Sequence, residues 1–164
     1  MGAGFDTLSL RIATEYPDLS IIEIDHPASQ AWKREALGRL GLQFENIHFL
    51  SLDLLRDTMQ EVLLRSTHYD RNRPSVFVAE GLLMDLTEKE TTAILDFIKA
   101  DSGPGSRFIF TYMEKNAEME KNAEGDYQFR NASWLTSAWL RMTREVFTWG
   151  YGKRVLSSSC KKHS

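Results

Sequence analysis

A glycine-rich segment and an aspartate that follows it are the residues best suited to hold a nucleoside-containing ligand. The segment is Gly2-Ala3-Gly4, and the aspartate is Asp25 at the end of the apolar run that starts at Ile21. Glycines let the backbone come close to a ligand, and an acid roughly twenty residues later, after the second strand of a βαβ unit, accepts hydrogen bonds from both hydroxyls of a ribose. This spacing predicts a nucleotide-binding βαβ unit.

Two more acids follow apolar runs that are typical of buried strands. Asp53 ends the run 46–53, and Glu80 follows the run 75–79. In an open parallel sheet, ligands bind outside the carboxyl ends of the strands, where the strand order reverses. We therefore expect Asp25, Asp53 and Glu80 to lie near one another at one edge of the sheet.

The glycine segment differs from the dinucleotide fingerprint at its third small residue, where this chain has Thr7. A fingerprint without that residue does not favour a pyrophosphate ligand. It favours a ligand without two phosphates, such as S-adenosylmethionine, with the amino-acid end of the ligand against the glycine loop.

Apolar periodicity predicts strands that alternate with helices. The expected elements are a helix from about Phe5 to Tyr16, a strand over 19–24, a helix from Pro27 to Gly38 with Ala28, Ala31, Trp32 and Leu37 as its apolar face, a strand over 46–53, a helix over 54–65, a strand over 75–79, a helix from Thr87 capped by Glu90, and a strand over 107–112. Such alternation predicts an α/β, Rossmann-like, mostly parallel sheet with helices on both faces.

The pattern lacks the first strand, because a glycine loop of this kind follows a buried strand, and it also lacks the last strands. We expect the first strand to belong between the strands that end at Asp25 and Glu80. An empty position there would leave backbone groups unpaired at about 1 kcal/mol or more each. We therefore expect a rearranged sheet, a protein of low independent stability, or a second copy of the chain that fills the position as a homo-oligomer.

The C-terminal third is less regular. The polar segment 113–131 predicts a long loop or an exposed helix, and a helix is expected from Trp134 to Met142. We expect a partial domain over residues 1–150 and a disordered, basic tail over 151–164.

Several motifs in order resemble the leucine carboxyl methyltransferase family, which includes polyketide O-methyltransferase-like proteins. They are Gly2-Ala3-Gly4-Phe5-Asp6-Thr7, Glu23-Ile24-Asp25-His26-Pro27, Ser51-Leu52-Asp53-Leu54, Glu80-Gly81-Leu82-Leu83-Met84, Phe110-Thr111-Tyr112 and Phe147-Thr148-Trp149-Gly150. The resemblance spans most of residues 2–150. It implies a class I S-adenosylmethionine-dependent methyltransferase.

The resemblance also implies a role for each site residue. It puts Gly2 and Gly4 against the methionine moiety, Asp25 on the ribose, Asp53 and Leu54 around the adenine, and Glu80 near the methionine end. From the residues alone, two of these acids have an alternative. Asp25 could cap the helix that begins at Pro27, and Asp53 could cap a helix that begins at Leu54.

Methyl transfer to an oxygen requires alignment of the two reactants more than proton chemistry. A carboxylate acceptor is already ionised near neutral pH, whereas a hydroxyl would profit from a general base. Among His26, His48, His68 and Tyr112, we select Tyr112 as the catalytic candidate. We expect His48 to be a half-buried structural residue and His68 to be solvated.

Composition limits the partners. The net charge of −3 does not favour nucleic acid, and no segment has the length and apolarity of a membrane span. With one cysteine the chain forms no internal disulfide, and we expect a cytoplasmic protein. We expect no metal site, and the resemblance implies a small molecule or a carboxyl terminus as the partner. Two alternatives remain open. One is a fragment of a nicotinamide-dependent oxidoreductase, and the other is a catalytically inactive relative that acts as a binding module.

Overall fold

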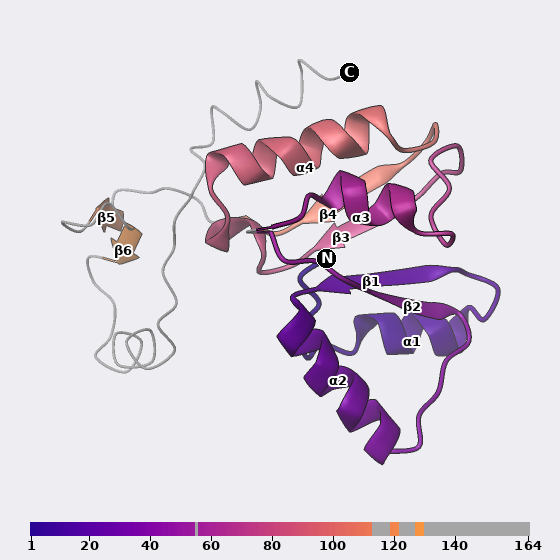
Figure 1. Ribbon diagram of the computed structural model, residues 1–164. Helices are drawn as coiled ribbons and strands as arrows, with labels where there is room; N and C mark the ends of the chain where they lie inside the picture. Colours follow the sequence, from indigo (N-terminus) through magenta and orange to yellow (C-terminus); the bar gives the residue numbers. More distant parts are fainter. Residues whose placement is uncertain (55, 113–118, 122–126, 130–164) are drawn as a thin grey trace. The chain divides into compact units, whose positions relative to one another are not determined.

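A computed structural model describes residues 1–54, 56–112, 119–121 and 127–129. In chain order its elements are α1 (Leu8–Glu15), β1 (Ile21–Asp25), α2 (Pro27–Arg39), β2 (Ile47–Ser51), α3 (Met59–Arg65), β3 (Val76–Ala79), the 3₁₀ turn η1 (Leu83–Asp85), α4 (Glu88–Ala100), β4 (Arg107–Phe110), β5 (Met119–Lys121) and β6 (Tyr127–Phe129). The α/β class predicted from the alternating pattern is confirmed (Figure 1).

The chain divides into two compact units. The first contains Met1–Glu80 and Thr92–Ile109, and the second contains Gly81–Thr91 and Phe110–Ser164. All predicted cofactor-binding residues fall in the first unit. The predicted catalytic residue, Tyr112, falls in the second.

The first unit is built around the parallel pair β1 and β2. Ile21 lies opposite Ile47, and Asp25 lies opposite Ser51, so the two strands end at the same level. Helices α1 and α2 lie on one side of this pair and α3 lies on the other (Figure 1). Helices therefore cover both faces of the strands, as the sequence predicts.

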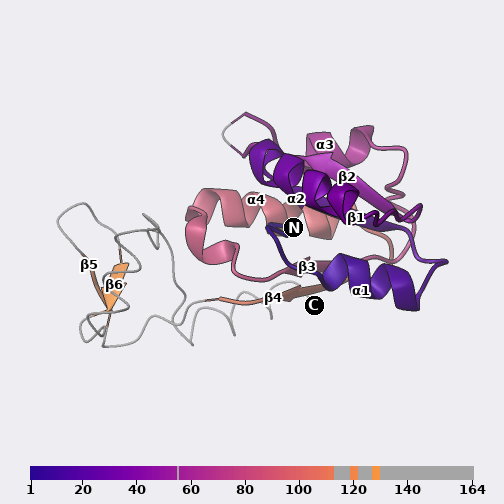
Figure 2. The ribbon, with the colours of Figure 1, turned by 90° about the horizontal axis from the view of Figure 1, so that it is seen from below.

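A second pair consists of β3 and β4, which run side by side in Figure 1 and in the view turned by 90° in Figure 2. Beside it lies an aromatic cluster in which the ring centroids of Tyr69, Phe77 and Phe97 are 6.0 to 6.4 Å apart. The carboxylate of the buried Asp101 is 2.7 Å from the guanidinium of Arg71, and the Asp101 carbonyl accepts a hydrogen bond from the Tyr69 hydroxyl. These contacts connect the end of α4 to the loop before β3.

Helix α3 begins later than the periodicity predicts. Its first residue is Met59, and Thr58 and Glu61 form a capping box, in which the Glu61 amide donates to the Thr58 hydroxyl oxygen at 3.2 Å. The periodicity from Leu54 predicted five residues too many because it does not register the cap that fixes the start. The capping box predicted at Thr87 and Glu90, in contrast, is present.

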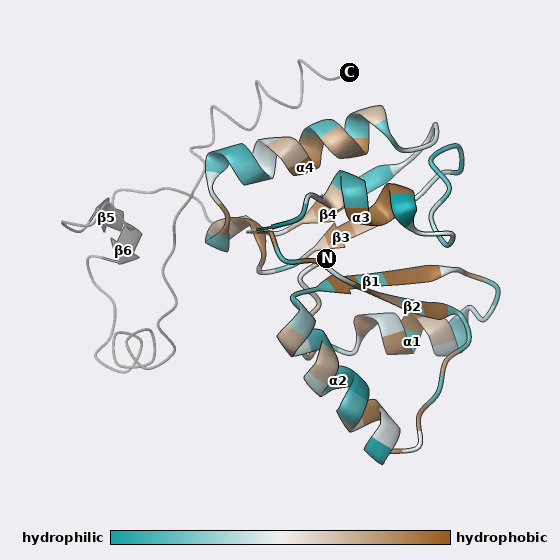
Figure 3. Ribbon diagram, viewed as in Figure 1, coloured by the Kyte–Doolittle hydropathy of each residue, from teal (hydrophilic) through white to brown (hydrophobic). Residues whose placement is uncertain are grey.

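The apolar face predicted for α2 is confirmed at Leu37 and wrong at Ala28, Ala31 and Trp32, which are exposed. Trp32 is 65% exposed, and the buried residues of this helix are Gln30, Lys33 and Leu37. Figure 3 shows the hydrophobic strands β1 and β2 beside a helix that alternates between hydrophilic and hydrophobic residues. The helix turns polar side chains toward the strands because β1 carries the buried Glu23 and because Gln30 bonds backbone carbonyls of both strands.

The segment predicted as a loop or an exposed helix contains two short strands. Within residues 113–131, β5 and β6 form an antiparallel pair in which Glu120 lies opposite Gln128. The helix expected from Trp134, the boundary at residue 150 and the tail over 151–164 lie outside the described residues. In the part of the chain that the structure describes, no helix has both the length and the apolarity to cross a membrane.

We expect Gly103→Ala to destabilise the first unit by about 1–3 kcal/mol. A Cβ atom at Gly103 would lie 2.4 Å from the carbonyl carbon of Arg73, so one backbone segment has to move. Gly38→Ala is the matched control, because a Cβ at this helical glycine meets no atom within 4 Å. The control should stabilise the protein by roughly 0.5–1 kcal/mol. Urea unfolding measures both, and equal effects would contradict this packing.

We expect His48 to make stability fall as the pH drops. Its ring stacks on that of His68 with centroids 3.5 Å apart, and burial and the neighbouring imidazole lower the pKa of His48. The unfolded chain therefore binds a proton near pH 6.5 that the folded chain does not yet bind. Stability is then complete above about pH 6.5 and decreases below it, toward the lowered pKa.

Thermal melting between pH 8 and pH 5 tests this expectation. His48→Gln should reduce the loss of stability on acidification, whereas His26→Asn, which keeps an acceptor at the start of α2, should retain the wild-type dependence. The same pH dependence in His48→Gln and the wild type would refute this role.

Candidate cofactor-binding site

The glycine segment forms a tight loop before α1. Gly2 has a φ of 62° and Gly4 a φ of 45°, both in the left-handed region that glycine tolerates best. A Cβ at Gly4 would meet no atom within 4 Å, so backbone conformation rather than crowding requires glycine there. The Asp6 amide closes the turn by donating to the Ala3 carbonyl at 2.9 Å.

The start of this loop lies between β1 and β3. The Gly2 amide donates to the Ile24 carbonyl at 2.9 Å, and the Met1 nitrogen donates to the Val78 carbonyl at 2.8 Å. These bonds bring the loop beside the carboxyl ends of the two strands. Met1 and Gly2 thus lie in the position between β1 and β3 that the sequence pattern assigns to a first strand. That a second copy of the chain fills this position stays a prediction.

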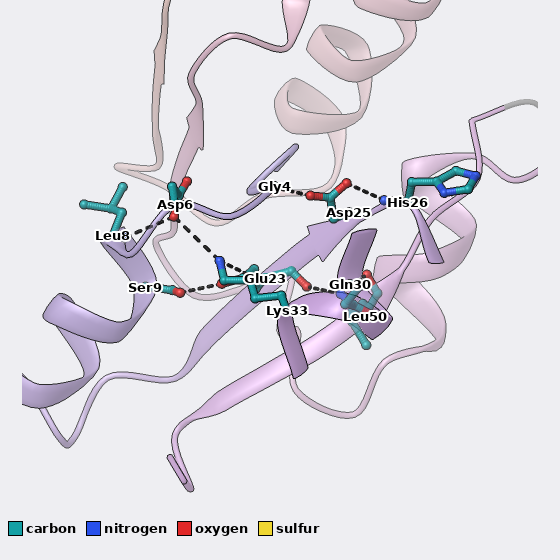
Figure 4. A network of polar contacts seen from close by, with 10 residues as sticks. All are labelled: Gly4, Asp6, Leu8, Ser9, Glu23, Asp25, His26, Gln30, Lys33 and Leu50. Atoms are coloured by element: carbon teal, nitrogen blue, oxygen red, sulfur yellow. Dashed lines mark hydrogen bonds and ion pairs between the residues drawn. The ribbon is translucent and has the colours of Figure 1, made fainter. Parts of the chain in front are cut away.

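Asp25 holds the glycine loop through its carboxylate. The Gly4 amide donates to Oδ2, and the His26 amide donates to Oδ1 at 2.6 Å (Figure 4). The cap of α2 is His26, whose Nδ1 accepts from the Ala28 amide at 3.2 Å. The alternative in which Asp25 caps that helix is therefore wrong.

Asp53 follows β2 next to Asp25 in the sheet. The Leu52 amide donates to the Asp25 carbonyl at 2.9 Å, which keeps the two strand ends together. The Asp53 carbonyl accepts from the Arg56 and Asp57 amides, and its carboxylate lies 3.5 Å from the Arg56 guanidinium. Because Thr58 caps α3, the alternative in which Asp53 caps a helix starting at Leu54 is also wrong.

The remaining predicted residues follow the second strand pair. Glu80 is exposed directly after β3, whose Val78 carbonyl accepts from Met1 beside the glycine loop. Tyr112 is 41% exposed in the second unit, with its ring centroid 6.2 Å from that of Phe110. The roles predicted for Glu80 and Tyr112, like those of Gly2, Gly4, Asp25, Asp53 and Leu54, stay predictions.

A buried polar cluster that the sequence pattern did not predict lies beneath the loop. Glu23 accepts a hydrogen bond from the Ser9 hydroxyl, and its other carboxylate oxygen lies 2.9 Å from Lys33 Nζ. Only 2% of the Glu23 side chain and 5% of the Lys33 side chain are exposed. A glutamate inside an isoleucine run was the available signal, since a buried carboxylate requires a cation or several donors.

Gln30 completes the polar contact between α2 and the strands. Its Nε2 donates to the Glu23 carbonyl at 3.2 Å and to the Leu50 carbonyl at 3.0 Å, and its Oε1 accepts from the Ser51 hydroxyl at 2.8 Å. The Gln30 side chain thus binds both strands.

Among the described residues, no group of three or more metal-binding side chains is present.

We expect Lys33→Met to destabilise the protein by about 3–5 kcal/mol, because it leaves the Glu23 carboxylate buried without its cation. Combining it with Glu23→Gln should recover most of that loss, because the neutral amide still accepts from Ser9. Urea unfolding of the single and double variants measures the difference. Identical midpoints for the two variants would contradict the importance of this ion pair.

Comparison with known proteins identifies relatives over most of the chain. The leucine carboxyl methyltransferase family matches residues 1–99. A proposed S-adenosyl-L-methionine-dependent methyltransferase of Mycolicibacterium paratuberculosis is 30% identical over 75% of this chain and 39% of its own length. A similar protein of Mycolicibacterium smegmatis is 31% identical over 92% of this chain and 50% of its own length. The chain therefore spans half or less of these two relatives.

A solved structure also resembles this chain. It is described as PigF with SAH, and it matches 70% of this chain and 31% of its own chain at 23% identity and a TM-score of 0.49. Family assignment comes from the sequence, because the match to residues 1–99 covers the glycine loop, Asp25, Asp53 and Glu80. This chain belongs to the leucine carboxyl methyltransferase family.

Proposed function

We propose that the first unit binds S-adenosylmethionine for the transfer of its methyl group to a carboxylate or hydroxyl oxygen. The observation that supports this most is the position of Asp25 between the end of β1 and the glycine loop. Each carboxylate oxygen of Asp25 already accepts one backbone amide and has a further lone pair. The two oxygens can therefore accept one ribose hydroxyl each.

The backbone around the loop suits the amino-acid end of this ligand. Gly4 has open space where a side chain would begin, so a ligand can approach its backbone. Glu80 follows β3 on the other side of the Met1 and Gly2 backbone and is exposed. Its carboxylate can accept hydrogen bonds from an ammonium group, which is the role we assign to it.

The strand next to β1 supplies the groups for the adenine. The Asp53 carboxylate can accept from the exocyclic amino group, and the Leu54 amide can donate to a ring nitrogen. Register supports this assignment, because Asp25 lies opposite Ser51 and Asp53 follows two residues later. A ligand that reaches from Asp25 to Asp53 crosses only one strand spacing, about 4.8 Å.

The bound cofactor would supply a methyl group on a sulfonium, and the protein contributes position. Because such a displacement needs the acceptor oxygen in line with the methyl group, rate enhancement comes chiefly from holding the two together. An ionised carboxylate requires no base, whereas a hydroxyl acceptor would use Tyr112. The acceptor we propose is a small molecule or a carboxyl terminus, in the cytoplasm.

Calorimetric titration with S-adenosylhomocysteine, NAD and NADP tests the cofactor assignment. We expect heat only with S-adenosylhomocysteine, and we expect Asp25→Asn to lower its affinity roughly 10- to 100-fold, because an amide cannot accept from both hydroxyls and both backbone amides.

Asp96→Asn is the matched control, since it makes the same chemical change on the exposed side of α4. Its affinity should equal that of the wild type. Binding of a dinucleotide would favour the oxidoreductase alternative, and no binding of any ligand would favour an inactive relative.

A further inference from the structure

We propose that Lys33 is a positioning residue that holds the glycine loop in its binding conformation by attracting Asp6. The ligand named here rests on the proposed function. The positioning itself rests on contacts that form without any ligand.

Lys33 lies on α2, which follows the glycine loop, α1 and β1 in the chain. Its Nζ lies 2.9 Å from Glu23 Oε1 on β1 and 3.8 Å from Asp6 Oδ1 at the end of the loop. The same Asp6 oxygen accepts from the Leu8 amide at 3.0 Å, at the first residue of α1. One ammonium group thus connects α2, β1 and the junction between the loop and α1 (Figure 4).

Strand β1 also holds the loop at Gly4 and the first turn of α1 at Ser9. Glu23 and Asp25 are two residues apart on a strand, so their side chains leave the same face. Asp25 accepts from Gly4, and Glu23 accepts from Ser9. Lys33 keeps Glu23 compensated and adds the contact at Asp6, which lies between these two points in the chain.

The Asp6 contact differs from the buried pair in its exposure. The Asp6 side chain is 45% exposed, so its ion pair with Lys33 contributes little to global stability. Such a contact instead limits the conformations that the loop can adopt. A loop already held in place reduces the ordering cost that ligand binding must overcome.

Asp6→Asn tests the positioning role, because it removes the charge and keeps an oxygen that can accept from Leu8. We expect an unchanged melting temperature, faster amide hydrogen exchange over residues 2–8 without ligand, and a roughly threefold to tenfold lower affinity for S-adenosylhomocysteine. Arg39→Met is the control. It removes an exposed cation of α2 whose ion pair is with Glu35, and it should change neither exchange nor affinity.

A second set of variants keeps the test independent of folding. In the Glu23→Gln/Lys33→Met background, affinity should already be reduced, and adding Asp6→Asn should reduce it no further. The proposal would be overturned if Asp6→Asn lowered the affinity by the same factor in that background as in the wild type. It would also be overturned if Asp6→Asn left the amide exchange of residues 2–8 unchanged. If the wild type does not bind S-adenosylhomocysteine, the proposed function fails, and the exchange rates of Asp6→Asn and the wild type alone decide whether Lys33 positions the loop.

Discussion

The attachment of the glycine loop to β1 is the interaction on which the candidate site depends. The loop has two residues at positive φ, and β1 fixes it through the Ile24 carbonyl, which accepts from the Gly2 amide, and the Asp25 carboxylate, which accepts from the Gly4 amide. On the same strand, the Glu23 carboxylate accepts from Ser9 in the first turn of α1. The carboxylate at the strand end, Asp25, remains able to accept ligand hydroxyls. The carboxylate inside the strand, Glu23, is buried. The same strand face thus combines a structural acid with one that is available for binding.

Burial of Glu23 explains the unusual face of α2. A carboxylate removed from water requires a cation and further donors, and α2 supplies the ammonium of Lys33 while α1 supplies the hydroxyl of Ser9. An apolar helix face at this place would leave the carboxylate without its cation. The large apolar residue Trp32 is consequently turned away from the strands and is exposed.

The parts of the fold that depend on short-range sequence patterns could be predicted from the sequence. Apolar runs gave the positions of β1, β2, β3 and β4, and a local signal, a threonine three residues before a glutamate, gave the cap before α4. Periodicity failed at α3, where apolar residues continue across a turn that precedes the cap. It failed again on α2, because its buried face is chosen by a partner on β1 and not by hydropathy. Lys33 and Gln30 could not be assigned without knowing which strand they face.

The backbone at Met1 and Gly2 connects β1 to β3 beside the candidate site. The Gly2 amide bonds a carbonyl of β1, and the Met1 nitrogen bonds a carbonyl of β3. A backbone that bonds strands on both sides places them at about two strand spacings, roughly 10 Å apart. Strands that end on either side of one loop present their terminal acids to the same region, and β1 supplies Asp25 while β3 leads to Glu80. Two hydrogen bonds of adjacent residues thus connect the loop to β1, which ends at Asp25, and to β3, which Glu80 follows, while the convergence of the acids stays a prediction.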